Sequence, residues 1–149
     1  MKKLSLIIAI LITGLLGQTA WSQNKDTVEY YTNSPDALLS SAVRVGNMLY
    51  LSGMTGRDPE TRKFPDDVAT QTHNIMKNIK ATLEKYGSSL DEVVKCTVFM
   101  ANPDDREALN KAYRSYFGDH PPARSGVGNL ILSGGALVEI ECMATVGLK

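Results

Sequence analysis

The stretch from Asp67 to Tyr86 most constrains the fold, because its apolar residues recur with the period of an α-helix. These apolar positions are Val68, Ile75, Met76, Ile79, Leu83 and Tyr86. Gly87 follows them and supplies a helix stop. A helix with one apolar stripe must pack that stripe against another element. The sequence therefore predicts an amphipathic helix laid on a β-sheet.

Segments with strand patterns precede and follow this helix, and they are expected to form the sheet. Residues 42–45 and 48–54 are largely apolar runs separated by the turn pair Gly46-Asn47, so they predict a β-hairpin. Residues 92–100 contain the run VVKCTVFM and predict a further strand. The hairpin precedes the helix and this strand follows it, so the sheet combines segments that are far apart in the chain.

A second helix should begin at Asn102 and end before Gly118. Asn102 suits the N-cap, Pro103 suits the first helical position, and the acidic residues after it suit the positive end of the helix dipole. Its apolar face is expected to contain Ala108, Leu109, Ala112, Tyr113, Tyr116 and Phe117. Two more strands follow, one near residue 124 and one at 136–146. The order β-β-α-β-α-β-β predicts an α+β fold in which two helices cover one face of a mixed sheet.

The segment between His120 and Val146 contains the best candidates for chemistry, Arg124 and, fifteen positions later, Glu139. A turn at 133–135 should let the last two strands pair antiparallel, which would place Arg124 roughly opposite Glu139. Arginine clamps a carboxylate with two parallel hydrogen bonds, and a glutamate can orient or deprotonate a water molecule. The pattern alone favours a simpler interpretation, a structural ion pair across a hairpin, and leaves the reactive site as the alternative.

The first 22 residues have the pattern of a secretory signal peptide. Met1-Lys2-Lys3 is positively charged, residues 4–16 form an apolar run that is short for a membrane span, and Ala20-Trp21-Ser22 offers small residues for cleavage. Residues 23–37 are polar and should be a flexible lead-in to one domain at 38–149. The chain is therefore expected to be exported, periplasmic or secreted, without membrane contact after cleavage at residue 22.

The charge balance argues against a nucleic-acid partner. Cleavage after residue 22 would leave 127 residues and remove two of the 16 Lys and Arg residues, so 14 basic residues would face 16 acidic ones. The basic residues form no run interleaved with aromatic residues. Arg57, Arg62 and Lys63, in the charged loop at 55–65, should be solvated.

The two cysteines, Cys96 and Cys142, both fall in expected strands. Export would permit a disulfide, but the favoured expectation is two buried free thiols. With His73 and His120 these cysteines lack the close paired spacing of a zinc ligand set, so no metal site is expected. His73 lies near the apolar stripe of the first helix and should be a packed or half-exposed histidine without a catalytic role.

The string PPARSGVGNLILSGGALVEIECMA, at 121–144, resembles the signature of the Rid family of reactive intermediate deaminases, also called the YjgF or L-PSP family. That signature has the form P-A-R-S-x-V followed by L-P-x-G-A-L-V-E-I-E-x-I-A. Upstream, residues 42–100 are similar to the rest of the family pattern, with Leu51-Ser52-Gly53 in the position of its Ser-Gly strand and VKCTVF after the helix. The resemblance covers roughly residues 38–147.

The resemblance implies a chorismate-mutase-like fold that assembles as a homotrimer, with helix-free sheet faces lining a central barrel and three sites in clefts between subunits. It also implies roles for single residues. Arg124 would bind the carboxylate of a small 2-imino or 2-enamino acid, and Glu139 would hold the water that attacks the imine carbon. Ser52 and Gly53 would form part of the pocket wall. No cofactor is implied.

Two positions depart from the family pattern. Gly126 stands where the family usually has Cys, so the backbone groups around the carboxylate remain but the thiol does not. Leu39 stands where the family has Tyr in its N-terminal segment, which makes the pocket edge less polar. The expected function is an enamine/imine deaminase that releases 2-oxo acids and ammonia from a small 2-imino acid. The alternative is a non-catalytic trimer that binds a small carboxylate or acts as a holdase-like protein.

Overall fold

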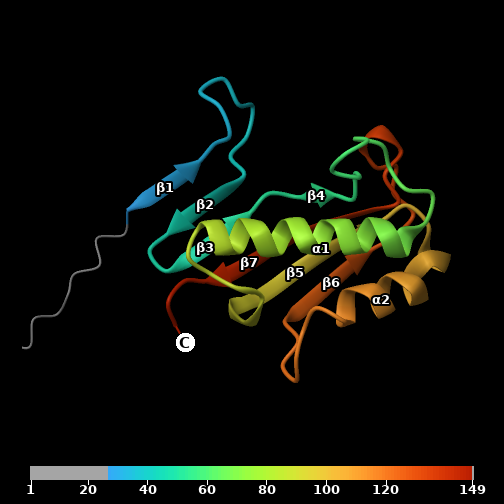
Figure 1. Ribbon diagram of the computed structural model, residues 1–149. Coiled ribbons are helices and arrows are strands. Elements are labelled where there is room, and N and C mark those ends of the chain that lie inside the picture. Colours follow the sequence, from blue (N-terminus) through green and yellow to red (C-terminus); the bar gives the residue numbers. More distant parts are fainter. Residues whose placement is uncertain (1–26, 149) are drawn as a thin grey trace, which may run out of the picture.

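The computed structural model describes residues 27–148. The expected signal peptide at 1–22, its cleavage point and the first residues of the expected lead-in at 23–37 lie outside the described residues. Within them, the chain forms a seven-stranded sheet with two α-helices on one side (Figure 1). Helix α1 runs across the middle of the sheet and α2 lies beside β6. The predicted α+β fold with two helices on one face is confirmed.

The strands are β1 (Val28–Tyr31), β2 (Ala42–Val45), β3 (Met48–Leu51), β4 (Met54–Thr55), β5 (Val93–Met100), β6 (Ala123–Val127) and β7 (Val138–Thr145). The helices are α1 (Val68–Lys85) and α2 (Arg106–Arg114), with short 3₁₀ turns at Leu90–Glu92, Pro103–Asp105 and Ser133–Gly135. Both helix starts follow from local chemistry. The Asp67 side chain caps α1 by accepting from the backbone N–H of Thr70, and Asn102 caps the turn before α2 by accepting from the N–H of Asp104.

The expected hairpin at 42–54 is confirmed for β2 and β3, which pair antiparallel from Ala42 opposite Leu51. The region expected to be a flexible lead-in is more ordered than predicted. Strand β1 lies inside it and pairs antiparallel with β2, and Tyr31 at the end of β1 stacks on Tyr86 with ring centroids 4.1 Å apart. Aromatic stacking and backbone pairing together hold this segment on the domain.

The strand order is β1-β2-β3-β7-β5-β6, so β5 lies between β6 and β7. The prediction that the strands carrying Arg124 and Glu139 form a hairpin is therefore wrong. Strand β6 instead pairs parallel with β5, while β7 pairs antiparallel with the other edge of β5. The physical reason is the connection through α2, because a parallel neighbour needs a long crossover and the helix between β5 and β6 provides one.

The core lies between the sheet and the helices. Alternate residues of β5 and β7 point into it, as the strand pattern requires. Its fully buried large side chains include Leu49, Ile75, Met76, Ile79, Leu83, Val98, Leu109, Val138 and Ile140. Ala108, which the helical pattern placed on the buried face of α2, is exposed instead.

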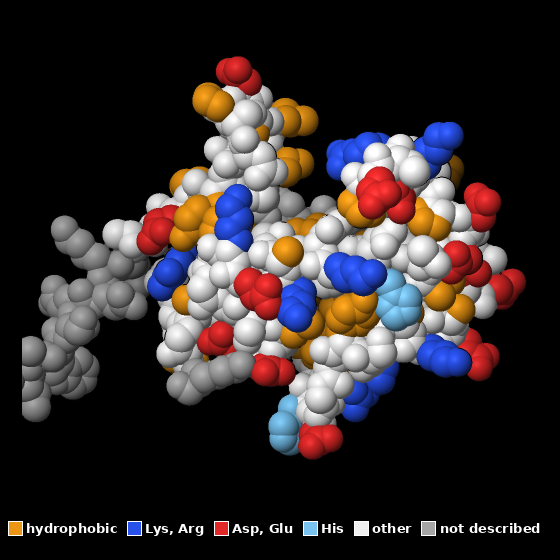
Figure 2. Space-filling model, in the orientation of Figure 1, with side chains coloured by type: hydrophobic (Ala, Val, Ile, Leu, Met, Phe, Trp, Pro, Cys, Tyr) orange, Lys and Arg blue, Asp and Glu red, His pale blue; other side chains and the backbone are white. Residues whose placement is uncertain are grey.

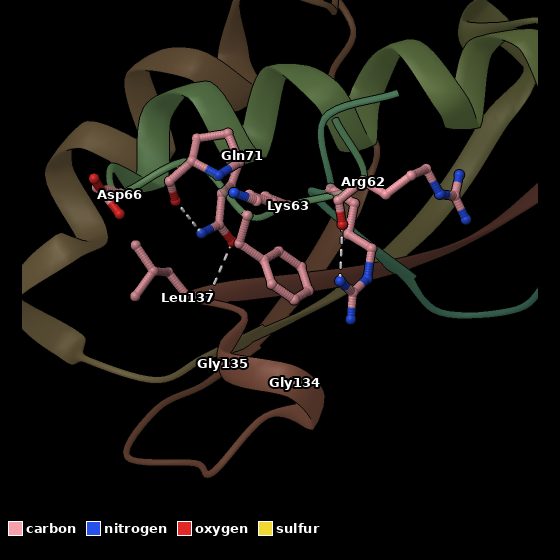
Figure 3. A pocket seen from close by; sticks show the side chains of 10 residues that line it. Arg62, Lys63, Asp66, Gln71, Gly134, Gly135 and Leu137 are labelled. Carbon is pink, nitrogen blue, oxygen red and sulfur yellow. Dashed lines mark hydrogen bonds between the residues drawn. The ribbon is translucent and has the colours of Figure 1, made fainter. Parts of the chain in front are cut away.

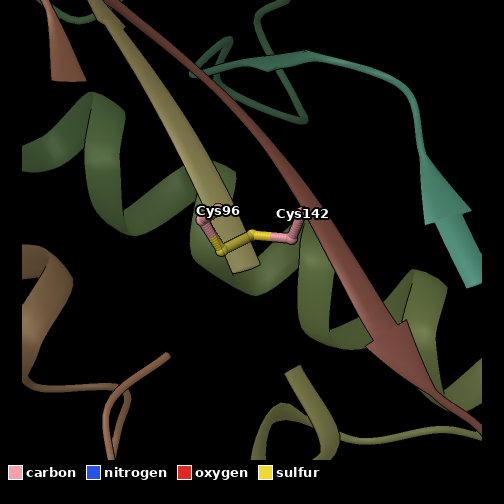
Figure 4. The surroundings of a disulfide bond; sticks show 2 residues. All are labelled: Cys96 and Cys142. Carbon is pink, nitrogen blue, oxygen red and sulfur yellow. A yellow bond between two sulfur atoms is a disulfide. The ribbon is translucent and has the colours of Figure 1, made fainter. Parts of the chain in front are cut away.

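Cys96 and Cys142 form a disulfide between β5 and β7 (Figure 4). The expectation of two free thiols is therefore wrong. The cause is the strand order, because placing β5 beside β7 brings Cys96 directly opposite Cys142 with a Cα–Cα distance of 4.1 Å. Both residues point into the core and are essentially inaccessible to solvent. The bond therefore links two neighbouring strands of the sheet beneath the helices.

On the face shown in Figure 2, acidic and basic side chains are interspersed over the helices, with small apolar patches between them. Neither α1 nor α2, the α-helices of residues 27–148, is long and apolar enough to cross a membrane. In the same residues, no three His, Cys, Asp or Glu side chains are grouped closely enough to hold a metal ion.

Candidate functional site

Arg124 lies on β6, a strand with one neighbour in the sheet, and its side chain lies against α2. In the β5–β6 register, Arg124 is opposite Cys96, whose side chain faces the helices. The guanidinium Nη2 donates a 2.6 Å hydrogen bond to the Asn110 side-chain oxygen. The same guanidinium lies over the Tyr113 ring, 4.8 Å from its centroid. Two residues of α2 therefore hold Arg124 in one orientation before any ligand is bound.

The Tyr113 hydroxyl is buried and has no hydrogen-bond partner among the residues that the structure describes. Its side chain is only 4% exposed. Burial raises the pKa of Tyr113 to about 12, although the positive charge of Arg124 opposes this rise. The tyrosine is therefore neutral at ordinary pH and keeps unused hydrogen-bonding capacity next to Arg124.

A cavity of about 180 Å³ opens between β6 and α2. Arg106, Asn110 and Arg124 supply its polar lining, and Gly126 lines it without a side chain. Its other walls are Val98, Met100 and Leu109. A Cβ on Gly126 would lie 3.9 Å from the Met100 side chain, which is ordinary van der Waals contact, so a larger residue would narrow the cavity. We call Arg124, Gly126, Asn110 and Tyr113 the arginine cluster.

Glu139 lies on β7 and points away from the helices. Its neighbours Val138 and Ile140 are fully buried in the core, so the alternation of the strand places Glu139 on the opposite face. Its carboxylate lies against Gly53, where a Cβ added to the glycine would overlap Glu139 Oε1. Only a residue without a side chain leaves room for the carboxylate in this position.

Ser52 precedes Gly53 in the chain and is hydrogen-bonded to the segment that contains Leu39. The Ser52 hydroxyl donates a 2.6 Å hydrogen bond to the backbone oxygen of Ser40, which joins the segment before β2 to the segment after β3. Leu39, next to Ser40, is 62% exposed and belongs to the β1–β2 connection that projects from the sheet (Figure 1). We call Leu39, Ser52, Gly53 and Glu139 the glutamate cluster.

The site residues proposed from the sequence thus fall into two groups. Arg124 and Gly126 lie together on the helix-covered face at the β6 edge. Gly53 lies against Glu139 on the open face, Ser52 precedes Gly53, and Leu39 adjoins Ser40, the residue to which Ser52 is hydrogen-bonded. The expected approach of Arg124 to Glu139 through a hairpin does not occur within one chain. Glu139 lies two strands away from β6, and it precedes by three residues Cys142, the β7 residue in the row that contains Arg124.

Sequence reasoning missed Arg106 and Asn110, and it assigned Tyr113 only to the buried face of α2. A signal for all three was present. Their spacing of i, i+4 and i+7 places them on one face of a helix. The crossover connection from β5 to β6 then brings this face beside Arg124. Without the parallel pairing of β5 and β6, the spacing alone did not indicate which strand the face would meet.

A second cavity, of about 470 Å³, lies between the loop at 57–66 and the turn at 134–137 (Figure 3). Gln71 joins the two segments, because its side-chain amide donates to the Pro65 oxygen and its side-chain oxygen accepts from the Leu137 N–H. Arg57 lies over the Phe64 ring and donates to the Arg62 backbone oxygen. These contacts explain the folding of the loop without a ligand.

His73 belongs to neither cluster. Its Nδ1 is 3.0 Å from the Tyr116 hydroxyl, and the two rings pack together at the junction of α1 and α2. The prediction of a packed, half-exposed helix histidine is confirmed.

The chain matches known proteins over most of its length. The sequence pattern of the family described as Endoribonuclease L-PSP matches residues 32–146. The chain is 37% identical over 134 residues to Reactive Intermediate Deaminase A, chloroplastic, of Arabidopsis thaliana, which covers 88% of this chain and 71% of the relative. It is 34% identical over 119 residues to the 2-iminobutanoate/2-iminopropanoate deaminase of Mus musculus, covering 78% of this chain and 88% of the relative.

The fold matches a solved structure as well. The crystal structure of RidA from the Antarctic bacterium Psychrobacter sp. PAMC 21119 is 35% identical, covers 76% of this chain and 92% of its own, and superposes with a TM-score of 0.70. Sequence pattern, curated relatives and fold agree. The chain therefore belongs to the L-PSP family, which is also the family of the reactive intermediate deaminases.

Proposed function

We propose that this protein hydrolyses small 2-imino acids, and the 2-enamino acids in equilibrium with them, to 2-oxo acids and ammonia. The observation that carries the proposal is the arginine cluster, in which Asn110 and Tyr113 hold the Arg124 guanidinium at a cavity. A guanidinium held in this way suits the carboxylate that every 2-imino acid carries. Two relatives are named for deaminase activity, one of them for 2-iminobutanoate and 2-iminopropanoate.

The chemistry needs water and no cofactor. Water adds to the carbon of the protonated imine, a proton moves from the added oxygen to nitrogen, and the C–N bond breaks as the C=O bond forms. One imine and one water thus give one 2-oxo acid and one ammonia. Arg124 would bind the substrate carboxylate, and Glu139 would hold the water, accept its proton and pass it to the leaving nitrogen. Because the iminium carbon is already electrophilic, positioning contributes more than a strong base.

The proposed active form is a homotrimer, because a single chain separates the two groups that the reaction needs. Typical sheet dimensions put the Arg124 and Glu139 backbones about 10 Å apart along the strands and about 10 Å apart across them, on opposite faces. A second copy could bring its glutamate cluster to the β6 edge of the first. The open face also exposes the apolar residues Val28, Tyr30, Val45, Tyr50 and Val127, which a neighbouring subunit could cover.

The proposed compartment is outside the cytoplasm, periplasmic or secreted. The Cys96–Cys142 disulfide supports this placement, because disulfides persist in oxidising compartments and are rare in the cytosol. The proposed partner is a small-molecule 2-imino acid met in that compartment. The proposal includes no nucleic-acid partner.

A second candidate function is binding of a small carboxylate without turnover, including a holdase-like role. The specific observation in its favour is that the arginine cluster is complete within one chain, whereas Glu139 lies elsewhere. Leu39, which stands where the family pattern has tyrosine, also presents an exposed apolar side chain. A binder needs the arginine cluster alone, so the role of Glu139 separates the two functions.

The test is the loss of 2-iminopropanoate generated by an amino-acid oxidase and trapped with semicarbazide, using the chain from Gln23. Acceleration that is lost in Arg124→Ala and in Glu139→Gln would support the deaminase. Glu139→Gln should still bind propanoate, whereas Arg124→Ala should not. Arg62→Ala removes an exposed arginine from a distant loop and is the matched control. If the protein forms a folded trimer but accelerates the loss of none of the imino acids tested, the result favours the binding function.

A further inference from the structure

Arg124 shares its cavity with a second arginine that the proposed reaction does not use. Arg106, the first residue of α2, lines the same cavity of about 180 Å³. The cavity therefore has two guanidinium groups and the Asn110 amide on its polar side. Its apolar side is formed by Val98, Met100 and Leu109, which are at most 3% exposed. Apolar walls of this kind strengthen the attraction between a guanidinium and an anion.

No acidic side chain neutralises these arginines within the described part of the chain. The Arg106 side chain makes no hydrogen bond, ion pair or ring contact there, and the salt bridge between Lys80 and Glu84 lies elsewhere, on α1. Arg124 is held by a neutral amide and a neutral aromatic ring. The acidic neighbours of Arg106 in sequence, Asp104, Asp105 and Glu107, do not line this cavity. Glu107 lines an adjoining cavity of about 620 Å³ that Arg124 also lines, but it forms no salt bridge with Arg124.

The position of Arg106 also has a cost for the fold. A cation in the first turn of a helix lies at the positive end of the helix dipole, where an anion is preferred. Two like charges that face one small cavity repel each other in addition. An arginine kept in this position therefore fits a role in binding an anion better than a role in stabilising α2.

We infer that the preferred substrates are 2-imino acids with a second carboxylate, such as 2-iminobutanedioate. Arg124 takes the carboxylate next to the imine, and Arg106 takes the carboxylate at the far end of the side chain. Gly126 leaves the space between the cavity wall and Arg124 open for the carbon chain. This inference rests on the proposed function, because it names the substrate class of the same site. The reaction still consumes one water and releases one ammonia.

The test compares two substrates that differ by one carboxylate. 2-Iminobutanedioate and 2-iminobutanoate are generated from the matching amino acids by oxidases, and kcat/KM is measured for each by competition with semicarbazide. Arg106→Gln should lower kcat/KM for the diacid about tenfold to 100-fold, the range that a charge-assisted hydrogen bond supplies, and leave the monoacid nearly unchanged. Arg106→Lys should restore part of the preference, and Arg62→Gln should change neither value.

A binding measurement separates this inference from the proposed function. Butanedioate and butanoate carry no imine, and calorimetry should show tighter binding of butanedioate to the wild type and similar affinities in Arg106→Gln. If no imine is hydrolysed but this Arg106-dependent difference remains, the deaminase proposal fails and the two-carboxylate site stands. If 2-iminobutanoate is hydrolysed while Arg106→Gln alters neither the substrate preference nor butanedioate binding, the deaminase stands and the inference is overturned.

Discussion

The side chains of Arg124 and Glu139 point from opposite faces of the same sheet. Arg124 lies against α2 on the covered face, whereas Glu139 lies against Gly53 on the open face. Strand β5 separates the strands that carry them. A small imino acid cannot contact both side chains of one chain in this arrangement. The two residues can act on one substrate only where two subunits meet.

Mixing two inactive variants tests this consequence. In a refolded 1:1 mixture of Arg124→Ala and Glu139→Gln chains, a quarter of the subunit boundaries in a cyclic trimer should combine an intact arginine with an intact glutamate. Activity should therefore recover to about one quarter of the wild-type value. Each variant refolded alone should remain inactive. No recovery in a mixture that demonstrably forms mixed trimers would mean that the two residues do not share a site across subunits.

A methyl group on Gly53 should disturb the reaction without unfolding the protein. The added Cβ would overlap Glu139 Oε1, so the carboxylate must move away from its position. Since misplacing a catalytic group by about 1 Å can cost a factor of 100, Gly53→Ala should lower kcat at least about tenfold. Its thermal midpoint should stay close to that of the wild type, because the end of a side chain can move at little cost. Gly118→Ala, where a Cβ meets nothing within 4 Å, is the control.

Tyr113→Phe should make stability less sensitive to alkaline pH. Because burial raises the pKa of Tyr113 from 10.0 to about 12 in the folded protein, the unfolded chain loses this proton first as the pH rises. The resulting loss of wild-type stability begins near pH 10 and continues until the folded pKa is passed. The free energy of unfolding should therefore fall by about 1 kcal/mol more in the wild type than in Tyr113→Phe between pH 9 and 11.

At neutral pH, Tyr113→Phe should be as stable as the wild type or more stable by about 1 kcal/mol. The reason is that the substitution removes a buried hydroxyl that has no hydrogen-bond partner among the described residues. Urea unfolding at several pH values measures both effects, and the difference between the two proteins cancels the titration of other groups. A clear loss of stability at neutral pH would show that the hydroxyl has a bonding partner in solution.

Reduction of the disulfide should weaken the fold without abolishing it. The bond links residues 46 positions apart, and removing such a link typically costs about 2–4 kcal/mol. Strands β5 and β7 still share their hydrogen-bonded ladder after reduction. The urea midpoint of the wild type should therefore fall in the presence of a reductant, whereas that of the Cys96→Ala, Cys142→Ala double variant should not respond. Identical wild-type curves with and without reductant would show that the bond is not formed.

The sequence by itself determined the local elements of this protein. The period of the apolar residues and the capping residues Asp67, Asn102 and Gly87 indicated where α1 and the turn before α2 begin and where α1 ends. The pair Gly46-Asn47 indicated the β2–β3 hairpin. These features depend on contacts between residues close in the chain, so a local pattern is enough to predict them.

Only the tertiary structure decided which strands are neighbours, and the candidate site depends on that choice. Inserting β5 between β6 and β7 paired Cys96 with Cys142, placed Arg124 against α2 and left Glu139 on the other face. The sequence named both functional candidates but predicted the wrong pairing between their strands. Strand pairing is decided by packing of the whole chain, because each strand has two edges and its alternation of side chains fits several partners equally well.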